Sequence, residues 1–376
     1  MEIHMMLQLI RNCCLLFLSN LIFLSLSSFA QTYVAGNIYF DSTSFVEYRA
    51  GNLPIIISAS HGGTLEPTGI PDLSCNGTPS GFIDSYTKEI AEGIYNTFYV
   101  ETGCYPHVII NHVHKKKFQP NANMTNAACG NITIEKAWTA YHSFIDSAEV
   151  QIVKNYSRGF LLDLHGHGHS IQRIELGYLL DTNKLRLSDS VLNISTNINK
   201  SSIRKLIGSN ILNLSHADLL RGQYSFGTLL EKKGFPSIPS SSNPFTLIGE
   251  PYFTGGYITR RHGSRDNNGG LDAIQIEFNQ GIRFNSLMRD TLIDSISATL
   301  IEYIDYHYFN QFANNSCSVL SVDINETTNA KINVYPNPTT NKEIFINNTN
   351  GLETIEVFDI SGRKIDLVDR VYNTVS

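Results

Sequence analysis

Three segments of this chain each run directly into side chains that can bind a metal ion. Each segment is short and mostly apolar, as in a buried strand: Leu53–Ser58 leads to His61, Gly159–Leu162 leads to Asp163–His169, and Leu271–Ile276 leads to Glu277. In open α/β sheets, ligands bind outside the carboxyl ends of the strands, where loops gather distant residues. Histidines and a carboxylate delivered in this way could hold zinc and activate a water molecule.

His61 is the first candidate zinc ligand. A single histidine is more often structural, so its surroundings must carry the prediction. Gly62 and Gly63 follow it and allow the backbone to turn tightly behind the imidazole. A strand followed by this His-Gly-Gly sequence favours a ligand.

The histidine-rich segment Asp163–His169 supplies the second candidate ligand. It holds three histidines within five residues, directly after an apolar run. We expect His165 to bind the metal, and Asp163 to hold the other ring nitrogen and set the tautomer. We expect His167 to contact the substrate or the transition state. His169 has no assigned role.

A third ligand is needed, because catalytic zinc keeps three protein ligands and one open position. Two carboxylates compete for this role. Glu66 lies five residues after His61 and could fold back within the same loop. Asp84 opens a predicted helix and could reach the same strand end, although it could also be a simple helix cap. We favour Asp84.

Glu277 is the candidate general base. It ends a strand in which polar and apolar residues interleave, and a buried carboxylate there needs a partner or a purpose. Beside zinc it could take a proton from water and then give one to the leaving amine. The alternative is a structural salt bridge to Arg283 or Arg260.

Four basic residues are candidates for holding a substrate carboxylate. Arg260 and Arg261 follow a Gly-Gly-Tyr sequence, and a guanidinium can bind a carboxylate through two parallel hydrogen bonds. Arg173 lies just beyond the histidine-rich segment. Lys117 belongs to a run of three lysines, which more often forms a solvated surface.

Strands and helices alternate between Leu53 and Phe309, after a short β-rich segment. The elements that we expect are a helix at Asp84–Val100, a strand at His107–Ile110, and helices at Glu135–Val153 and Leu287–Tyr308. This alternation predicts one α/β domain over residues 31–312, with a mostly parallel or mixed sheet flanked by helices.

The first thirty residues predict a secretory signal peptide. Arg11 precedes the apolar run Cys13–Leu24, and a small-residue exit ends at Ala30. No later segment is long and apolar enough to cross a bilayer. We therefore expect an exported protein, secreted or at the cell surface, with no stable membrane span.

Removal of that leader leaves four cysteines, namely Cys75, Cys104, Cys129 and Cys317. An exported chain with a small even number of cysteines usually pairs them, and no metal-binding CxxC spacing occurs here. We expect disulfides or buried thiols, with the connectivity open. The net charge of −6 and the isoelectric point near 6.0 argue against binding to nucleic acid.

The character of the chain changes after residue 312. Residues 313–330 are polar and predict a linker. Residues 331–376 predict a small all-β module with three short strands, at Lys331–Pro336, Glu343–Asn347 and Thr354–Phe358.

Five segments together resemble the N-formylglutamate amidohydrolase family, whose fold is related to that of the zinc carboxypeptidases. They occur in order: Ser58–Gly63, Asp163–His167, Glu175–Tyr178, Gly255–Tyr257 and Gln275–Glu277. The resemblance implies zinc-dependent hydrolysis of an amide, with His61 and His165 as metal ligands and Glu277 as general base. The substrate would be an N-acyl amino acid or a small peptide-like amide. Formyl is one of the candidate acyl groups.

The tail resembles the C-terminal sorting domain of the type IX secretion system of Bacteroidetes. Its two segments are Asn333–Pro338 and Val357–Arg363. The resemblance implies a bacterial protein that the type IX machinery carries across the outer membrane. Such domains continue through a further strand to a basic end, so we expect this tail to be truncated.

Two other readings of the whole chain stay open at this point. One is a carboxypeptidase-like metallopeptidase that acts on longer peptides. The other is a surface binding protein that has kept the fold and lost the chemistry.

Overall fold

The computed structural model describes residues 33–75, 81–267 and 269–310, together with four short strands beyond residue 330. The predicted signal peptide lies outside these residues and stays a prediction. In the described part of the chain, no helix combines the length and the apolar character needed to cross a membrane. The chain divides into two compact units, Met1–Leu320 and Ser321–Ser376.

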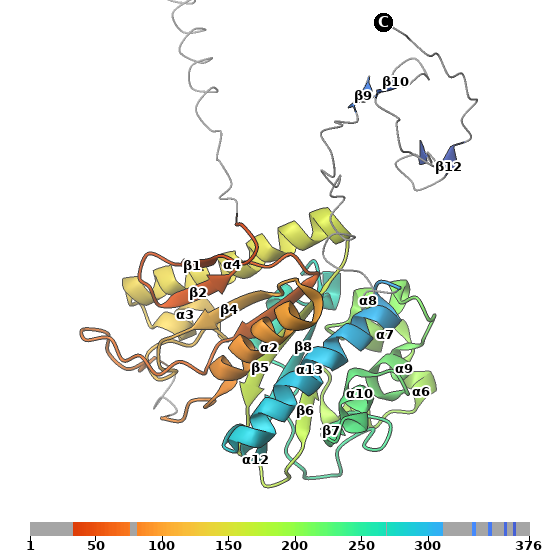
Figure 1. Cartoon of the computed structure of the whole chain (residues 1–376). Helices are drawn as coiled ribbons and strands as arrows, with labels where there is room; N and C mark the ends of the chain where they lie inside the picture. The colour runs from red at the N-terminus through yellow and green to blue at the C-terminus, as the bar shows by residue number, and fades with distance from the viewer. Residues whose placement is uncertain are drawn as a thin grey trace, which may run out of the picture. The chain divides into compact units, whose positions relative to one another are not determined.

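The first unit is built on one eight-stranded sheet (Figure 1). In chain order its strands are β1 (Ile38–Phe40), β2 (Val46–Arg49), β3 (Ile55–Ala59), β4 (His107–Asn111), β5 (Phe160–Gly166), β6 (Ile174–Gly177), β7 (Ser237–Ile238) and β8 (Asp272–Phe278). Across the sheet the order is β1-β2-β4-β3-β5-β8-β6-β7. The four central strands β4, β3, β5 and β8 are parallel, whereas β2 runs antiparallel to β4 and β6 antiparallel to β8.

The central strands are buried nearly throughout because helices cover both of their faces. Every residue of β3 and of β8 is buried. Ile55 and Ile57 of β3 belong to one core and Ile56 to the other, as the pleat of a strand requires. The predicted α/β class with a mixed sheet is confirmed.

Three long helices form the layers on either side of the sheet (Figure 1). Helix α4 (Ile132–Tyr156) packs on one face, against β2, β3 and β4. Helices α2 (Thr87–Thr102) and α13 (Ser286–His307) pack against each other and cover the opposite face. These helices correspond to three of those predicted from the sequence.

Shorter helices fill the connections, most of them between β6 and β8. They are α3 (Met124–Ala128), α5 (Thr182–Leu185), α6 (Asp189–Leu192), α7 (Ser195–Ile198), α8 (Arg204–Ser209), α9 (His216–Arg221), α10 (Phe226–Lys232), α11 (Tyr257–His262) and α12 (Gln280–Arg283), with a 3₁₀ turn at Arg265–Asn267. Several begin at a polar residue whose side chain accepts a backbone N–H, for example Asp181 and Ser225.

Helix α2 begins three residues later than the sequence predicts. Tyr86 precedes it in the left-handed region and makes no side-chain cap. The backbone carbonyl of Asp84, rather than its carboxylate, accepts hydrogen bonds from the N–H and the hydroxyl of Thr87. The reading of Asp84 as a simple helix cap is therefore wrong, and its carboxylate is available for another purpose.

A disulfide joins Cys75, in the loop after β3, to Cys129 at the end of α3. Cys104 is disulfide-bonded as well. Cys317 lies outside the described residues.

In the second unit, four short strands are described: β9 (Asn333–Tyr335), β10 (Phe345–Asn347), β11 (Val357–Phe358) and β12 (Lys364–Ile365). β9 pairs with β10 and β11 with β12, both antiparallel. The first three lie within the predicted strand segments. The linker at 313–330 and the remainder of 331–376 are outside the described residues, so the sorting domain stays a prediction.

Candidate metal centre

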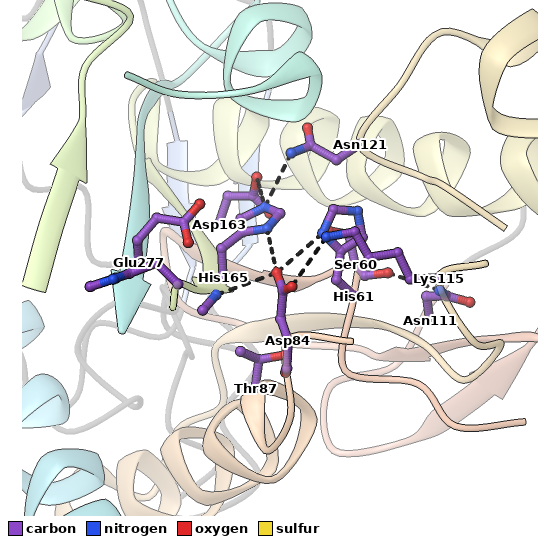
Figure 2. A network of polar contacts seen from close by, with 12 residues as sticks. Ser60, His61, Asp84, Thr87, Asn111, Lys115, Asn121, Asp163, His165 and Glu277 are labelled. Carbon is purple, nitrogen blue, oxygen red and sulfur yellow. Dashed lines mark hydrogen bonds and ion pairs between the residues drawn. The ribbon is translucent and has the colours of Figure 1, made fainter. Parts of the chain in front are cut away.

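The carboxyl ends of three neighbouring parallel strands meet at one edge of the sheet. His61 follows β3, His165 lies near the end of β5, and Glu277 lies near the end of β8. In the strand register, His165 lies directly beside Glu277. Asp84 reaches the same place from the segment before α2, as Figure 2 shows. The structure thus brings together four residues that the sequence predicts to share a site.

Three of these side chains place possible ligand atoms around one point. Asp84 Oδ2 lies 3.2 Å from His61 Nδ1 and 3.1 Å from His165 Nδ1, and the ligand atoms of all three are within 4.8 Å of one another. Ligand atoms about 2.1 Å from a tetrahedral zinc ion would lie roughly 3.4 Å apart. Two histidines and a carboxylate at this spacing fit zinc and leave its fourth position open.

The charges of this cluster also suit a cation. Burial alone would raise the pKa of Asp84, but His61 and His165 outweigh it and hold that pKa well below its usual range. Burial and the nearby Lys115 lower the pKa of His61 to about 4, so its ring is neutral and keeps a lone pair. Lys115 Nζ lies 3.3 Å from Asp84 Oδ1, the carboxylate oxygen that does not face the histidines.

A chain of buried polar groups orients His165. Its Nε2 lies 2.9 Å from Asp163 Oδ2. The Ser58 hydroxyl donates to Asp163 Oδ1 at 2.8 Å, and the Tyr141 hydroxyl lies 2.7 Å from Ser58 Oγ. Because Asp163 can only accept from the Nε2–H, the Nδ1 atom is the one presented toward Asp84. Asp163 thus has the position predicted from the sequence.

Without a metal, His165 is the side chain of the cluster that holds an extra proton. Burial would lower its pKa, but Asp163 and Asp84 outweigh burial and raise it well above the usual value. The proton on Nδ1 occupies the place where a metal ion would bind. Binding of a metal there would therefore release a proton.

Gly62 and Gly63 let the chain behind His61 pass close to two other elements. A Cβ on Gly62 would lie 2.6 Å from the backbone N of Lys88 in α2, and one on Gly63 would lie 2.3 Å from the carbonyl carbon of His112. Real Cβ atoms do not approach this closely, so these positions require glycine. The His-Gly-Gly sequence is thus explained by packing that holds His61 at the strand end.

His61 Nε2 is buried, and none of the described residues partners it. The ring's polar contact is made by Nδ1, the atom that faces Asp84. Because Nδ1 faces another ligand of the cluster, it is the nitrogen that would bind a cation.

Glu277 is buried, with 4 % of its surface exposed, and its carboxylate accepts a hydrogen bond from Gln275 at 2.9 Å. Burial raises its pKa to about 8. None of the ion pairs among the described residues includes it. Arg283, a predicted salt-bridge partner, instead donates to the backbone carbonyls of Phe278, Ser85 and His167. The structural salt-bridge alternative is therefore wrong.

Glu66 does not join the cluster. Its carboxylate lies 2.7 Å from Lys116 Nζ, and its side chain is 46 % exposed. Of the two carboxylates left open by the sequence, the structure places Asp84 beside the histidines.

His167 is held by its own loop, which corrects its predicted contact with the substrate. Its Nε2–H donates to the carbonyl of Arg173 at 2.8 Å, and its Nδ1 accepts the backbone N–H of His169 at 3.1 Å. Both ring nitrogens are therefore occupied. His169, Glu175 and His167 also offer ligand atoms within 4.8 Å of one another, but the bonds of His167 disfavour a metal there.

The four predicted carboxylate-binding residues are engaged elsewhere or exposed. Arg173 pairs with Glu250 at 3.0 Å, Lys117 with Asp72 at 3.0 Å, Arg261 with Asp146 at 3.3 Å, and Arg260 is exposed on α11. None of these contacts reaches His61, Asp84 or His165. Their predicted role in binding substrate at the cluster therefore has no support in the structure.

Two residues at the cluster were missed by the sequence reasoning. Lys115 belongs to the lysine run, where only Lys117 was singled out, yet it is Lys115 that contacts Asp84. Asn121 Nδ2 lies 3.2 Å from His165 Nε2, and its Oδ1 accepts the N–H of Ile258 in α11 (Figure 2). Both residues lie in the loop between β4 and α3 rather than directly at a strand end, so the local pattern did not indicate them.

Comparison with known proteins gives structural likeness alone. No family model matches the sequence, and no curated protein matches it. The N-formylglutamate amidohydrolase from Ralstonia eutropha JMP134 is 11 % identical, with a TM-score of 0.40 over 71 % of this chain and 97 % of that chain. A gene product from Agrobacterium tumefaciens is 10 % identical, with a TM-score of 0.40 over 69 % of this chain and 94 % of that chain.

A protein assigned as a carboxypeptidase A from Shewanella denitrificans OS-217 is 10 % identical, with a TM-score of 0.31 over 68 % of this chain and 60 % of that chain. These proteins are ones that the chain is similar to. Likeness at this level does not carry a function, which must rest on the geometry of the site.

Proposed function

We propose that the protein is a zinc-dependent amidohydrolase whose metal ligands are His61, Asp84 and His165. The observation that carries the proposal is the pairing of this ligand set with a buried carboxyl group. Glu277 lies beside His165 in the sheet and belongs to no ion pair among the described residues. Zinc held there would polarise a carbonyl and lower the pKa of water.

Glu277 is the proposed proton carrier of the reaction. A general base must be ionised before it can accept a proton from water. Burial disfavours the ionised form of Glu277, but a nearby dication would favour it. After the acyl carbon is attacked, the protonated Glu277 can deliver the proton to the departing amine.

Asp163 is the proposed positioning residue. Its carboxylate accepts from Nε2–H and so fixes the tautomer of His165. Asn121 lies beside the same ring, but its Nδ2 and His165 Nε2 are both donors, so it can only pack there. Lys115 holds the second oxygen of Asp84 and thereby favours a carboxylate with one oxygen toward the metal.

The proposed substrate is an N-acyl amino acid or a small peptide-like amide, with N-formyl amino acids among the candidates. This rests on the five sequence segments that resemble the N-formylglutamate amidohydrolase family. We also propose that the protein is exported and that the type IX machinery carries it, which rests on the two ends of the sequence. Fractionation of a native producer would test the export by locating the protein in the medium or at the surface.

The test of the function is a substrate panel with the chain from residue 31 onward. N-formyl and N-acetyl amino acids are compared with peptides carrying free or amidated carboxyl ends, and released amine is measured by mass spectrometry. We expect hydrolysis of N-acyl amino acids that chelation abolishes and zinc restores. A preference for longer free peptides would favour the carboxypeptidase-like reading. No turnover with zinc loaded, or turnover that resists chelation, would contradict the proposal.

A further inference from the structure

A second cluster of possible metal ligands lies on the α4 side of the sheet and shares no residue with the first. Asp146 and Glu149 are one turn apart on α4, and His262 ends α11. Their ligand atoms lie within 4.8 Å of one another. They line an open cleft of about 520 Å³ that Gly269 and Gly270 also border. We propose that Asp146, Glu149 and His262 bind a divalent transition-metal ion.

The hydrogen bonds of His142 determine which nitrogen of His262 faces this cleft. His142 Nε2 lies 3.2 Å from the carbonyl oxygen of Pro120, which can only accept, so Nε2 carries the proton. With that proton on Nε2, the Nδ1 atom of His142 is the ring nitrogen that can accept a hydrogen bond. His262 Nε2 lies 2.9 Å from that Nδ1 and must therefore donate to it. With its proton on Nε2, His262 has Nδ1 as the nitrogen that can offer a lone pair to a cation.

That lone pair points at a carboxylate. His262 Nδ1 lies 3.3 Å from Asp146 Oδ1, and the histidine is 2 % exposed. Two electron-rich atoms at this distance repel each other unless a cation lies between them or the ring takes a second proton. A metal ion satisfies both atoms at once.

The two carboxylates are arranged to serve such an ion. Arg261 donates to Asp146 Oδ2 at 3.3 Å, which leaves Oδ1 on the side of His262. Glu149 accepts a backbone hydrogen bond from Gly270, and a Cβ on Gly270 would lie 1.8 Å from Glu149 Oε1. A side chain at Gly270 would therefore displace the Glu149 carboxylate from its contact with the loop.

The donor set selects the class of metal. Mg²⁺ and Ca²⁺ prefer sites built from oxygen alone, whereas imidazole with carboxylates suits Zn²⁺, Mn²⁺ and similar ions. An ion here would link α4, the end of α11 and the Gly269–Gly270 loop. Because no residue of this cluster contacts His61, Asp84 or His165, we expect a structural role.

Equilibrium dialysis against Zn²⁺ alone, followed by metal analysis, tests the proposal on the chain from residue 31 onward. The wild type should bind two zinc ions per chain. The double variant Asp146→Asn, Glu149→Gln should bind one and keep its hydrolytic activity. Glu135→Gln, which removes an acid from the first turn of the same helix, is the matched control and should bind two.

The variant Asp84→Asn separates this site from the proposed catalytic one. It should also bind one zinc ion, and added Zn²⁺ should still raise its melting temperature. Combining it with the double variant should abolish both the binding and that shift. If Asp146→Asn, Glu149→Gln binds as many zinc ions as the wild type, the second site is refuted. If Asp84→Asn keeps the zinc content of the wild type while the double variant loses one ion, the catalytic proposal fails and this one stands.

Discussion

His165 Nε2 lies 2.9 Å from a carboxylate oxygen of Asp163, two residues earlier on the same strand. Side chains two apart on a strand share a face, so the strand itself delivers both members of the pair. The pair determines which ring nitrogen of His165 is presented to Asp84. The orientation of the proposed ligand is therefore built into β5.

The Asp163→Asn variant tests this orientation. The amide oxygen introduced at this position can still accept from Ser58, but the side chain no longer offers a negative charge to the Nε2–H of His165. We expect the affinity for zinc to fall about 10- to 100-fold, as for other residues that orient a metal ligand. Competition titration with a chromophoric chelator measures the change. Asp290→Asn, on the exposed side of α13, is the control, and an unchanged affinity in Asp163→Asn would remove the positioning role.

Asp84→Asn and Glu66→Gln compare the two carboxylates that the sequence left open. Asp84 contacts both histidines, whereas Glu66 pairs with Lys116 at the surface. We expect Asp84→Asn to lose the zinc ion of the catalytic site and all turnover, while Glu66→Gln keeps both. Metal analysis and the hydrolysis assay on the same preparations check this. Loss of zinc in Glu66→Gln alone would reverse the assignment.

The stability of the metal-free protein should depend on pH through Glu277. Its pKa in the folded state is about 8, above the ordinary value of 4.5. A carboxyl group with a raised pKa adds to the free energy of unfolding while it is protonated. This contribution is fully present below about pH 4.5 and is lost as pH rises to about 8. Relative to Glu277→Gln, the chelated wild type should lose up to about 5 kcal/mol over this range.

Denaturant unfolding of both proteins at pH 5 and pH 8 measures this difference. Glu89→Gln, on the exposed side of α2, should show the pH dependence of the wild type. A wild type that parallels Glu277→Gln at both pH values would show that Glu277 ionises normally in the folded protein.

Much of the site could be predicted because its residues lie at strand ends. His61, His165 and Glu277 each follow an apolar run, and parallel strands bring their carboxyl ends to one edge. Lys115 and Asn121 could not be predicted, because loops place them and loop conformation depends on contacts distant in sequence. The four basic residues were misjudged for the same reason, since their partners are fixed by tertiary packing.

The long elements were predicted and the short ones were not. Helices α2, α4 and α13 show their apolar periodicity over several turns. β3 and β5 begin with apolar runs, and β8 interleaves apolar with polar residues. The region between β6 and β8 folds into helices of four to seven residues, too short to show a period.

The disulfide between Cys75 and Cys129 should contribute strongly to stability. It closes a loop with a sequence separation of 54 residues. By the chain-entropy relation, a loop of this length stabilises the folded state by about 4 kcal/mol at most. We expect the variant Cys75→Ser, Cys129→Ser to lose a large part of this stabilisation, measured as its free energy of unfolding in denaturant, while it keeps its zinc. A change below about 0.5 kcal/mol would contradict the chain-entropy account.

In the proposed reaction, His61, Asp84 and His165 hold the metal and Glu277 carries the proton. The decisive measurement is the zinc content and the turnover of Glu277→Gln, determined on one preparation with the N-acyl amino acid that the wild type hydrolyses fastest. We predict the zinc content of the wild type and a fall in kcat/KM of roughly 1,000-fold or more, the scale expected for loss of a general base. Turnover within about tenfold of the wild type, with zinc in place, would contradict the account.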